Sequence, residues 1–368
     1  MNMKFANNKT FWRRKLPLCA LVAGLAGLIA GCVTTAKNTG PKYTFFPPAP
    51  DAPHLQYLTA FSSERDLRGS GASLMSFITG EQMSEHPILK PYGAAVHDGK
   101  IYVCDTGAGF IMRLDLVTRR LVAIVPEGPA SLKLPVNLAV DDRGWLYVAD
   151  SLRDQVVILD TNENLVATLG EKGTNRPRDV AVSAEHIYVG DIGSHQVHVY
   201  DRTTHAPLFD IPRGADATNM QRALFQPGNL ALDTQGRLYI SDLGGYRVQV
   251  FDADGKYLRT IGKYGDNFGE FARPKGVAVD RAGRVYVVDA AGQMVQIFDE
   301  NGRLLMWFGE PSGSKVGLDL PTKVVIDYDN AGFFQQYAAP DFQIEHLVLV
   351  INQYGPRKIS VFGFGHKK

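Results

Sequence analysis

The feature that most constrains the fold is a strand-and-turn pattern present in six copies along the chain. In its clearest copy, residues 274–298, a proline leads into a short apolar strand at 277–279, an Asp-x-x-Gly turn and a second strand at 285–288. An Asp and a polar turn then precede a third strand at 295–298. Runs of β-branched and aromatic residues bounded by Gly and Asp are typical of antiparallel sheet. The sequence therefore predicts an all-β chain.

The copies begin at prolines that lie 42 to 50 residues apart along the 368-residue chain. These prolines are Pro91, Pro135, Pro177, Pro227, Pro274 and Pro321. Third strands are expected at 110–114, 156–159, 197–200, 248–251 and 295–298, and fourth strands at 121–125, 165–169, 207–211, 257–261 and 304–308. A repeat of about 40–50 residues with four strands per copy is typical of a β-propeller. We expect six four-stranded blades, with seven as the alternative.

The sixth copy is interrupted and ends early. Pro321 and Asn352, which replaces the usual Asp, are 31 positions apart, whereas the other copies have 14 or 15, so a loop is inserted at 328–345. No fourth strand follows the third strand at 359–362. We predict that residues 74–79 complete this blade and that residues 55–61 add a strand beside them. Such closure would leave no exposed strand edge in the last blade.

The N-terminus has the features of an export signal. Residues 11–15 are cationic, and the apolar stretch 16–30 is too short to cross a bilayer comfortably. Its end, Leu-Ile-Ala-Gly-Cys, resembles the lipobox of bacterial lipoproteins, which implies a signal peptide at 1–31 and lipidation of Cys32. Val33 after the cysteine favours the outer membrane of a Gram-negative bacterium. An ordinary secretory signal or an uncleaved anchor is the alternative.

The remaining composition assigns no strong class of partner. Residues 32–54 are rich in Thr, Pro and Ala and are expected to form a flexible tether before a propeller at 55–368. The net charge of +1 gives no general attraction to nucleic acid. Three cysteines in unlike contexts do not imply a disulfide framework, and Cys104 is expected to be a small buried thiol.

The repeat P-x-G-V-A-V-D-x-x-G-x-V-Y-V-x-D resembles the NHL repeat over residues 74–365. The resemblance implies a monomeric six-bladed propeller whose innermost strands line a central channel. The family includes binding modules, sensor domains and a lyase, so it indicates the fold more than the function. One aspartate per copy follows the second strand and is expected to accept backbone N–H groups. These aspartates are Asp105, Asp150, Asp191, Asp242 and Asp289.

Three polar residues depart from the repeat at the start of consecutive blades. Asn137, Asp179 and Asn229 each lie two positions after a blade-leading proline. One carboxylate and two amide oxygens suit Ca²⁺ or Mg²⁺. The arrangement resembles the metal site of gluconolactonase-like and paraoxonase-like propellers, although their first-blade Glu has no equivalent here. The alternative is that these side chains only satisfy backbone groups or waters.

Cationic residues gather near the same prolines. They are Arg176, Arg178, Arg273, Lys275 and Lys323. If they converge, they could bind a carboxylate, a phosphate or an anionic sugar; otherwise they are solvated loop charges. The histidines lie at unlike offsets in their repeats, which disfavours a zinc centre.

These observations favour a binding or scaffolding module over an enzyme. An exported, lipid-anchored propeller would present its channel face, and the aromatic insertion with Phe333, Phe334 and Tyr337, to an envelope protein, a peptide or a glycan. The alternative is a metal-dependent hydrolase or lactonase that uses the Asn137 set. A sensor domain is a weaker third hypothesis.

Overall fold

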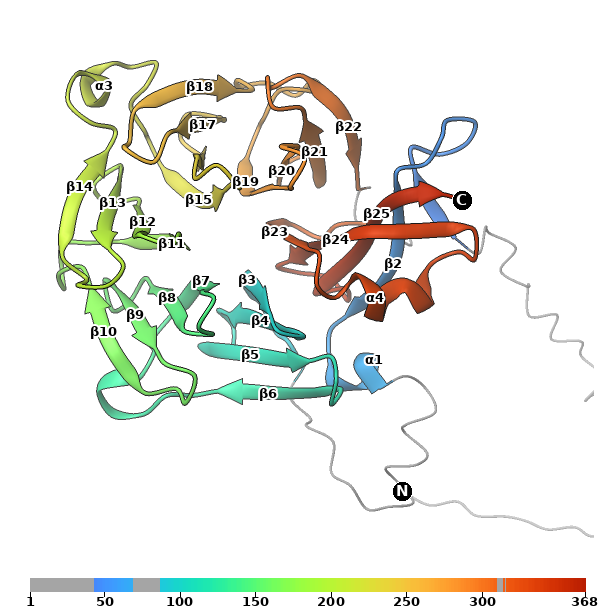
Figure 1. Ribbon diagram of the computed structural model, residues 1–368, viewed down its shortest axis with the longest axis horizontal. Helices are drawn as coiled ribbons and strands as arrows, with labels where there is room; N and C mark the ends of the chain where they lie inside the picture. The colour runs from blue at the N-terminus through green and yellow to red at the C-terminus, as the bar shows by residue number, and fades with distance from the viewer. Residues whose placement is uncertain (1–42, 69–86, 310–313, 315) are drawn as a thin grey trace, which may run out of the picture. The chain divides into compact units, whose positions relative to one another are not determined.

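Six antiparallel sheets surround a common centre (Figure 1). The computed structural model describes residues 43–68, 87–309, 314 and 316–368. The first strand of each sheet lies innermost and contacts the first strand of the next sheet, and β23 (Pro321–Asp327) contacts β3 (Pro91–His97). The ring is therefore closed, and the chain is an all-β six-bladed propeller as the repeats predicted.

The first five blades have four strands each, in chain order from the centre outwards. Blade one contains β3, β4 (Lys100–Asp105), β5 (Phe110–Asp115) and β6 (Arg120–Ile124). Blade two contains β7 (Pro135–Val140), β8 (Leu146–Asp150), β9 (Gln155–Leu159) and β10 (Leu165–Leu169). Blade three contains β11 (Pro177–Val182), β12 (His186–Asp191), β13 (Gln196–Asp201) and β14 (Pro207–Ile211). Blade four contains β15 (Pro227–Leu232), β16 (Leu238–Asp242), β17 (Arg247–Phe251) and β18 (Tyr257–Ile261). Blade five contains β19 (Pro274–Val279), β20 (Val285–Asp289), β21 (Met294–Phe298) and β22 (Leu304–Phe308).

Blade six has five strands and is closed by the N-terminal part of the chain. Its order is β1 (Thr44–Phe46), β2 (Leu55–Phe61), β25 (Ile359–Lys367), β24 (Phe342–Asn352) and β23. The prediction that residues 74–79 pair with the last strand was wrong, because β2 occupies that position directly. Residues 74–79 themselves lie outside the described residues. The buried side chains of Leu55 and Phe61 explain the choice, since both enter the core when β2 pairs with β25.

The aspartate after each second strand holds the entry to its own blade. Asp105 accepts the backbone N–H groups of Leu89 and Lys90 before β3, at 2.6 and 2.8 Å, and those of Gly107 and Ala108 in the following turn. Asp150, Asp191, Asp242 and Asp289 accept corresponding backbone N–H groups in their blades. These bonds satisfy buried carboxylates and give the five residues a structural role.

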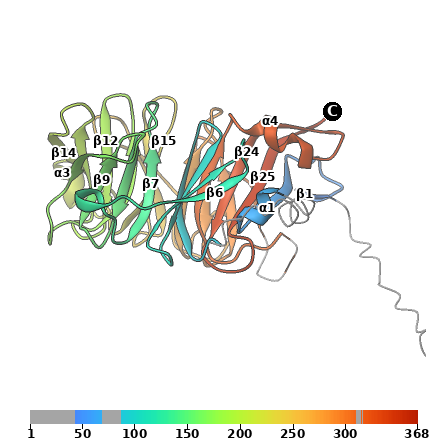
Figure 2. The ribbon, with the colours of Figure 1, turned by 90° about the horizontal axis from the view of Figure 1, so that it is seen from below.

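The inserted loop of blade six packs onto the core instead of forming an exposed aromatic surface. It contains α4 (Ala331–Phe334) and a 3₁₀ turn at Gln335–Tyr337, and α4 lies beside β24 (Figure 2). Phe334 is fully buried and its ring lies 5.9 Å from that of Phe61, while Phe333 and Tyr337 pack against the same cluster. The loop therefore covers the blade-six core, which was the alternative to a recognition loop.

Short helices and one early strand complete the described residues. The helices are α1 (Glu64–Arg68), a 3₁₀ turn at Gly128–Ala130 and α3 (Ala215–Thr218). Strand β1 begins at Thr44, so regular structure starts inside the stretch expected to be a tether. None of the described helices combines the length and the apolar character needed to cross a bilayer. Residues 1–42, with the expected signal and Cys32, lie outside the described part.

Candidate functional site

The residues two positions after each blade-leading proline meet at the centre of the ring. In blades one to four and in blade six, the ladder between the first two strands changes register just before this position. A β-bulge bends a strand and re-aims the next side chain. Gly93 and Gly276 occupy two of the six places, and a Cβ atom at either would come within 2.1 and 2.7 Å of the neighbouring blade. The other four places bring polar side chains together.

Asp179 and Lys323 form a buried ion pair across the centre. The Lys323 ammonium of blade six lies 2.6 Å from Asp179 Oδ2 of blade three, and both side chains are less than a tenth exposed. The same carboxylate accepts the backbone N–H groups of Val180 and Leu230 at 2.8 and 2.9 Å. Burial raises the pKa of Asp179, and the Lys323 ammonium opposes that shift. The pair joins opposite sides of the ring.

Two amides complete this group, which we call the channel cluster (Asn137, Asp179, Asn229 and Lys323). Asn137 Nδ2 donates to Asn229 Oδ1 at 3.1 Å, and Asn137 Oδ1 accepts the Leu138 N–H. Asn229 Nδ2 is buried and has no hydrogen-bond partner among the described residues. Ser241 lies opposite Asn229 in the β15–β16 ladder, and its buried Oγ also lacks a partner there. Unpaired buried donors are costly, so they point to an acceptor that is not part of the protein.

The residues one position after the prolines form a second layer. Tyr92 of blade one lies between two cations from alternate blades, with the Arg178 guanidinium 4.3 Å and the Lys275 ammonium 5.3 Å from its ring centre. Thr322 Oγ1 donates to the Tyr92 carbonyl at 2.7 Å and fixes the tyrosine backbone to blade six. Cations over an aromatic face are held by electrostatic attraction.

A cavity of about 160 Å³ opens between the two layers, and we call it the mouth pocket. Its lining includes Tyr92, Arg178, Gln226, Asn229 and Lys275. Gly228 and Leu243 also line the cavity. The polar side chains of the lining include a guanidinium, an ammonium and two amides, and the lining contains no carboxylate. Such a donor set suits a small anionic group.

Lys275 places a buried positive charge at the mouth pocket without a counter-ion among the described residues. Its side chain is 6% exposed, and among the described residues no carboxylate pairs with it. Burial, followed by the charges of Arg273 and Arg178, lowers the pKa of Lys275 to about 8. A buried cation without a counter-ion reduces stability unless a ligand supplies the opposite charge.

The structure separates the five predicted cations into three groups. Arg178 and Lys275 line the mouth pocket, and Lys323 is held by Asp179. Arg176 and Arg273, which precede their prolines, are exposed. Tyr92 is a site residue that the sequence argument missed, and its position one residue after Pro91, shared with Arg178 and Lys275 in their blades, is the pattern that could have revealed it.

The three predicted metal ligands come together, but their oxygens already have partners. Asp179 Oδ2 faces an ammonium, and Asn229 Oδ1 accepts from the other amide. Within the ranges that the structure describes, no group of three or more His, Cys, Asp or Glu side chains could hold a metal ion. The channel cluster, whose carboxylate is paired with Lys323, therefore does not fit a resident divalent cation.

A serine, a histidine and an aspartate meet on the outer part of blade three. Ser194 Oγ lies 3.2 Å from His198 Nε2, and His198 Nδ1 lies 2.7 Å from Asp210 Oδ1. However, Asp191 Oδ2 lies 3.4 Å from the same Nε2, and its hydrogen bond is the main cause of a raised pKa of His198. The two carboxylates thus favour the protonated imidazole, which opposes its use as a general base for Ser194.

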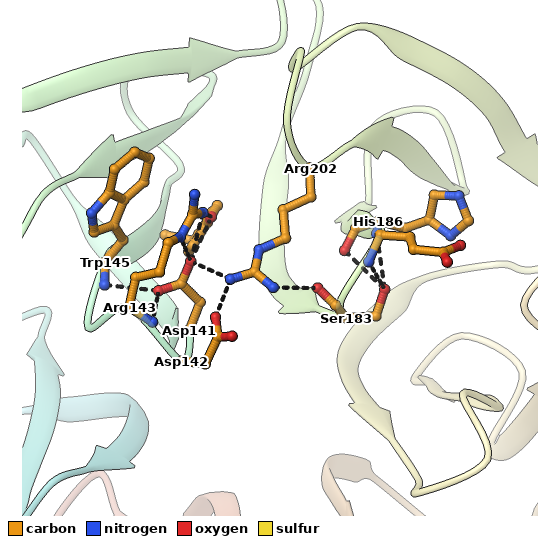
Figure 3. A network of polar contacts seen from close by, with 9 residues as sticks. Asp141, Asp142, Arg143, Trp145, Ser183, His186 and Arg202 are labelled. Atoms are coloured by element: carbon orange, nitrogen blue, oxygen red, sulfur yellow. Dashed lines mark hydrogen bonds and ion pairs between the residues drawn. The ribbon is translucent and has the colours of Figure 1, made fainter.

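A second ion-pair network joins blades two and three and is structural (Figure 3). Arg202, which directly follows β13 in blade three, donates to Asp141 Oδ2 at 2.8 Å and also bonds to Asp142. Burial lowers the pKa of Arg202, but these two carboxylates outweigh that effect and raise it. Arg143 bonds to Asp141 and lies over the Trp145 ring at 3.9 Å. The charges of this network balance within the protein.

Sequence comparisons agree with the fold. A family described as a six-bladed β-propeller matches residues 219–305. The gluconolactonase of Zymomonas mobilis is 28% identical over 189 residues, which is 45% of this chain and 51% of that protein. The chloroplastic protein SUPPRESSOR OF QUENCHING 1 of Arabidopsis thaliana is 29% identical over 123 residues, or 30% of this chain and 11% of that protein. The chain thus spans about half the length of the first relative and a small part of the second.

Solved structures with the same fold have little sequence in common with this chain. A gluconolactonase of Xanthomonas campestris has a TM-score of 0.55 and 16% identity, over 88% of this chain and 95% of that one. A protein of unknown function from Bacteroides thetaiotaomicron has a TM-score of 0.57 and 15% identity, over 76% and 70% of the two chains. At such identities the likeness shows the fold alone.

Proposed function

We propose that this protein is a binding module that captures the anionic group of its ligand in the mouth pocket. The observation that supports this most is Lys275, a buried ammonium without a carboxylate partner among the described residues. Arg178 adds a second positive charge on the same cavity, and Asn229, another lining residue, has a buried Nδ2 that lacks a partner among the described residues. An anion with two or more oxygens would satisfy all three groups.

The size of the pocket limits what can enter. A volume of about 160 Å³ is below that of pockets for drug-sized ligands, so one carboxylate or phosphate with its nearest atoms would fill it. The rest of the ligand would lie outside, over the ends of the first strands. This arrangement fits an acidic glycan, a peptide carboxylate or an acidic protein group, which are the partner classes expected from the sequence.

Calorimetric titration with acetate, galacturonate, a peptide with a free C-terminus, and phosphate would test the proposal. We expect at least one of these anions to bind the wild-type protein at one site per chain. Arg178→Met and Lys275→Met should each weaken that binding by roughly 10- to 100-fold, the loss typical of one charge-assisted hydrogen bond. The same peptide with an amidated C-terminus, which lacks the terminal carboxylate, should not bind.

Matched controls separate the pocket from general surface charge. Arg176→Met and Arg273→Met remove the same charges two residues away on the same blades, but from exposed positions. These controls should change the affinity less than about threefold, because exposed charges are screened by solvent and salt. Equal losses in both pairs of variants, or no binding of any anion, would contradict the proposal.

A sugar-lactone hydrolase is the second candidate, because the matched relative from Zymomonas mobilis is a gluconolactonase. A reaction that uses a divalent cation would need the Asp179 carboxylate, which the Lys323 ammonium already engages. Hydrolysis of glucono-δ-lactone can be followed with a pH indicator, with and without CaCl₂. We expect no rate above the spontaneous one; a calcium-dependent rate that Asp179→Asn abolishes would favour the hydrolase instead.

We further propose that the module acts in the bacterial envelope, anchored through a lipid on Cys32. The lipobox-like sequence before Cys32 supports this location. The anchor would hold the pocket close to envelope glycans and proteins, which are exposed to an exported lipoprotein.

A further inference from the structure

We infer that the Lys323 ammonium is the permanent cation of the channel cluster, so that the wild-type protein takes no divalent metal there and loss of the ammonium lets one bind. The inference does not depend on the mouth pocket or on the proposed binding function. It concerns the positive charge that balances Asp179 beside Asn137 and Asn229.

The geometry places Lys323 where its charge is needed. Three innermost strands bring one carboxylate and two amides to the same depth, and all three side chains are at most 1% exposed. A positive partner at close range offsets the charge of a buried carboxylate. The side chain of Lys323 crosses from blade six to supply it, with Nζ at 2.6 Å from Asp179 Oδ2.

Neighbouring residues make room for this lysine. Gly276 lies beside the Lys323 backbone, and a Cβ atom there would come within 2.7 Å of Lys323 Cα. Lys323 is 7% exposed, so its ammonium is largely shielded from solvent ions. The sixth blade is thus built to place a protein cation at the centre.

The charge count decides between the ammonium and a metal. One carboxylate and one ammonium sum to zero, whereas a divalent ion added to them would leave two uncompensated positive charges in a buried place. The free donor on Asn229 Nδ2 also repels a cation rather than binding it. Without Lys323, the same oxygens form the kind of set that Ca²⁺ and Mg²⁺ accept.

Thermal unfolding and elemental analysis of the full chain, purified without chelator, would test the inference. The wild-type protein should contain no stoichiometric Ca or Mg and should show the same Tm in EDTA and in CaCl₂ or MgCl₂. Lys323→Ala, which removes the charge and leaves space, should gain a Tm rise of roughly 2 °C or more with one of these ions. The double variant Lys323→Ala with Asp179→Asn should lose that rise.

Lys275→Ala removes another buried central lysine that has no carboxylate partner among the described residues, and it should gain no metal response. Stoichiometric metal in the wild-type protein would overturn the inference even if no variant folded. A folded Lys323→Ala variant that ignores both ions would overturn it as well.

Discussion

Lys275 shows at the scale of one residue how the proposed binding site would reduce the stability of its own fold. Its ammonium is buried beside Arg178 and Tyr92, and no carboxylate of the described residues compensates it. Residues selected for binding are often unfavourable for folding, since the ligand completes their interactions. Asp179 and Lys323 illustrate the opposite case, in which the protein supplies both charges.

Replacing Lys275 by Met should therefore stabilise the ligand-free protein. At pH 7 we expect the free energy of unfolding to rise by about 1–3 kcal/mol, the cost of an unpaired buried polar group. The folded pKa of Lys275, about 8, is below its unfolded value, so this cost is complete below pH 8 and is relieved as the pH rises further. Denaturant unfolding at pH 7 and pH 10 should thus show a smaller difference between variant and wild type at pH 10. A variant less stable than wild type at pH 7 would contradict the account.

Anion binding should depend on pH through the same residue. Binding requires the protonated Lys275, so the affinity should fall as the pH rises through and above 8. A bound anion raises the pKa of a nearby ammonium, which places the midpoint above the value of the free protein. Titrations between pH 7 and pH 10 would measure the midpoint. Lys275→Arg, which keeps its charge across this range, should bind with no such fall.

At the scale of the strand, the local sequence predicted the positions of most strands. It did not predict the pairing of strands that lie far apart along the chain. All six blade-leading prolines begin an innermost strand, and four of the expected fourth strands match residue for residue, including β10 and β22. Alternating apolar residues and Asp-Gly turns define such strands locally. The partner of β25 depends on a contact between residues about 300 positions apart, and several apolar segments before Pro91 could satisfy the same pattern.

The site was predicted in part for similar reasons. The four residues of the channel cluster stand out because they break the repeat at one offset. Tyr92 does not stand out, because an aromatic residue in a strand is common. The sequence also could not show which of the five cations line the pocket, since their distances from the blade-leading prolines were not compared. Which oxygen faces which donor depends on side-chain packing across the ring. The ion pair between Asp179 and Lys323 therefore could not be predicted from the sequence.

Removal of β1 and β2 should open the ring. A chain that starts at residue 62 would expose the edge of β25 and lose the buried side chains of Leu55 and Phe61. Exposed strand edges favour aggregation, and loss of a buried Phe side chain alone costs about 3–5 kcal/mol. We expect a lower Tm and concentration-dependent association by light scattering. A chain that starts at residue 43 keeps both strands and should behave as the full chain; equal behaviour of the two truncations would show that β2 does not close the ring.

At the scale of the whole molecule, we propose a rigid ring that an N-terminal lipid holds at the membrane. Closure by β2 keeps the innermost strands in place, so residues from four blades can meet in the channel cluster. An anchor at the N-terminus would fix where the mouth pocket is presented.

Substitution of Cys32 by Ser should release the protein from the membrane. In a Gram-negative host, the wild-type chain should incorporate labelled palmitate and sediment with the membrane fraction. The Cys32→Ser variant should carry no label and appear in the soluble periplasmic fraction, because one cysteine thiol is the expected lipid attachment point. Membrane association of the unlabelled variant would show that an uncleaved signal, or another contact, provides the anchor.

The most direct test of the central claim is the position of a bound oxyanion in a crystal. Crystals soaked in selenate should show an anomalous selenium peak in the mouth pocket, within hydrogen-bonding reach of Lys275 Nζ, the Arg178 guanidinium and Asn229 Nδ2. The peak should be absent from Lys275→Met crystals soaked in the same way. A wild-type pocket without selenium, or peaks confined to exposed arginines such as Arg176 and Arg273, would contradict the claim that this propeller captures anions at its mouth.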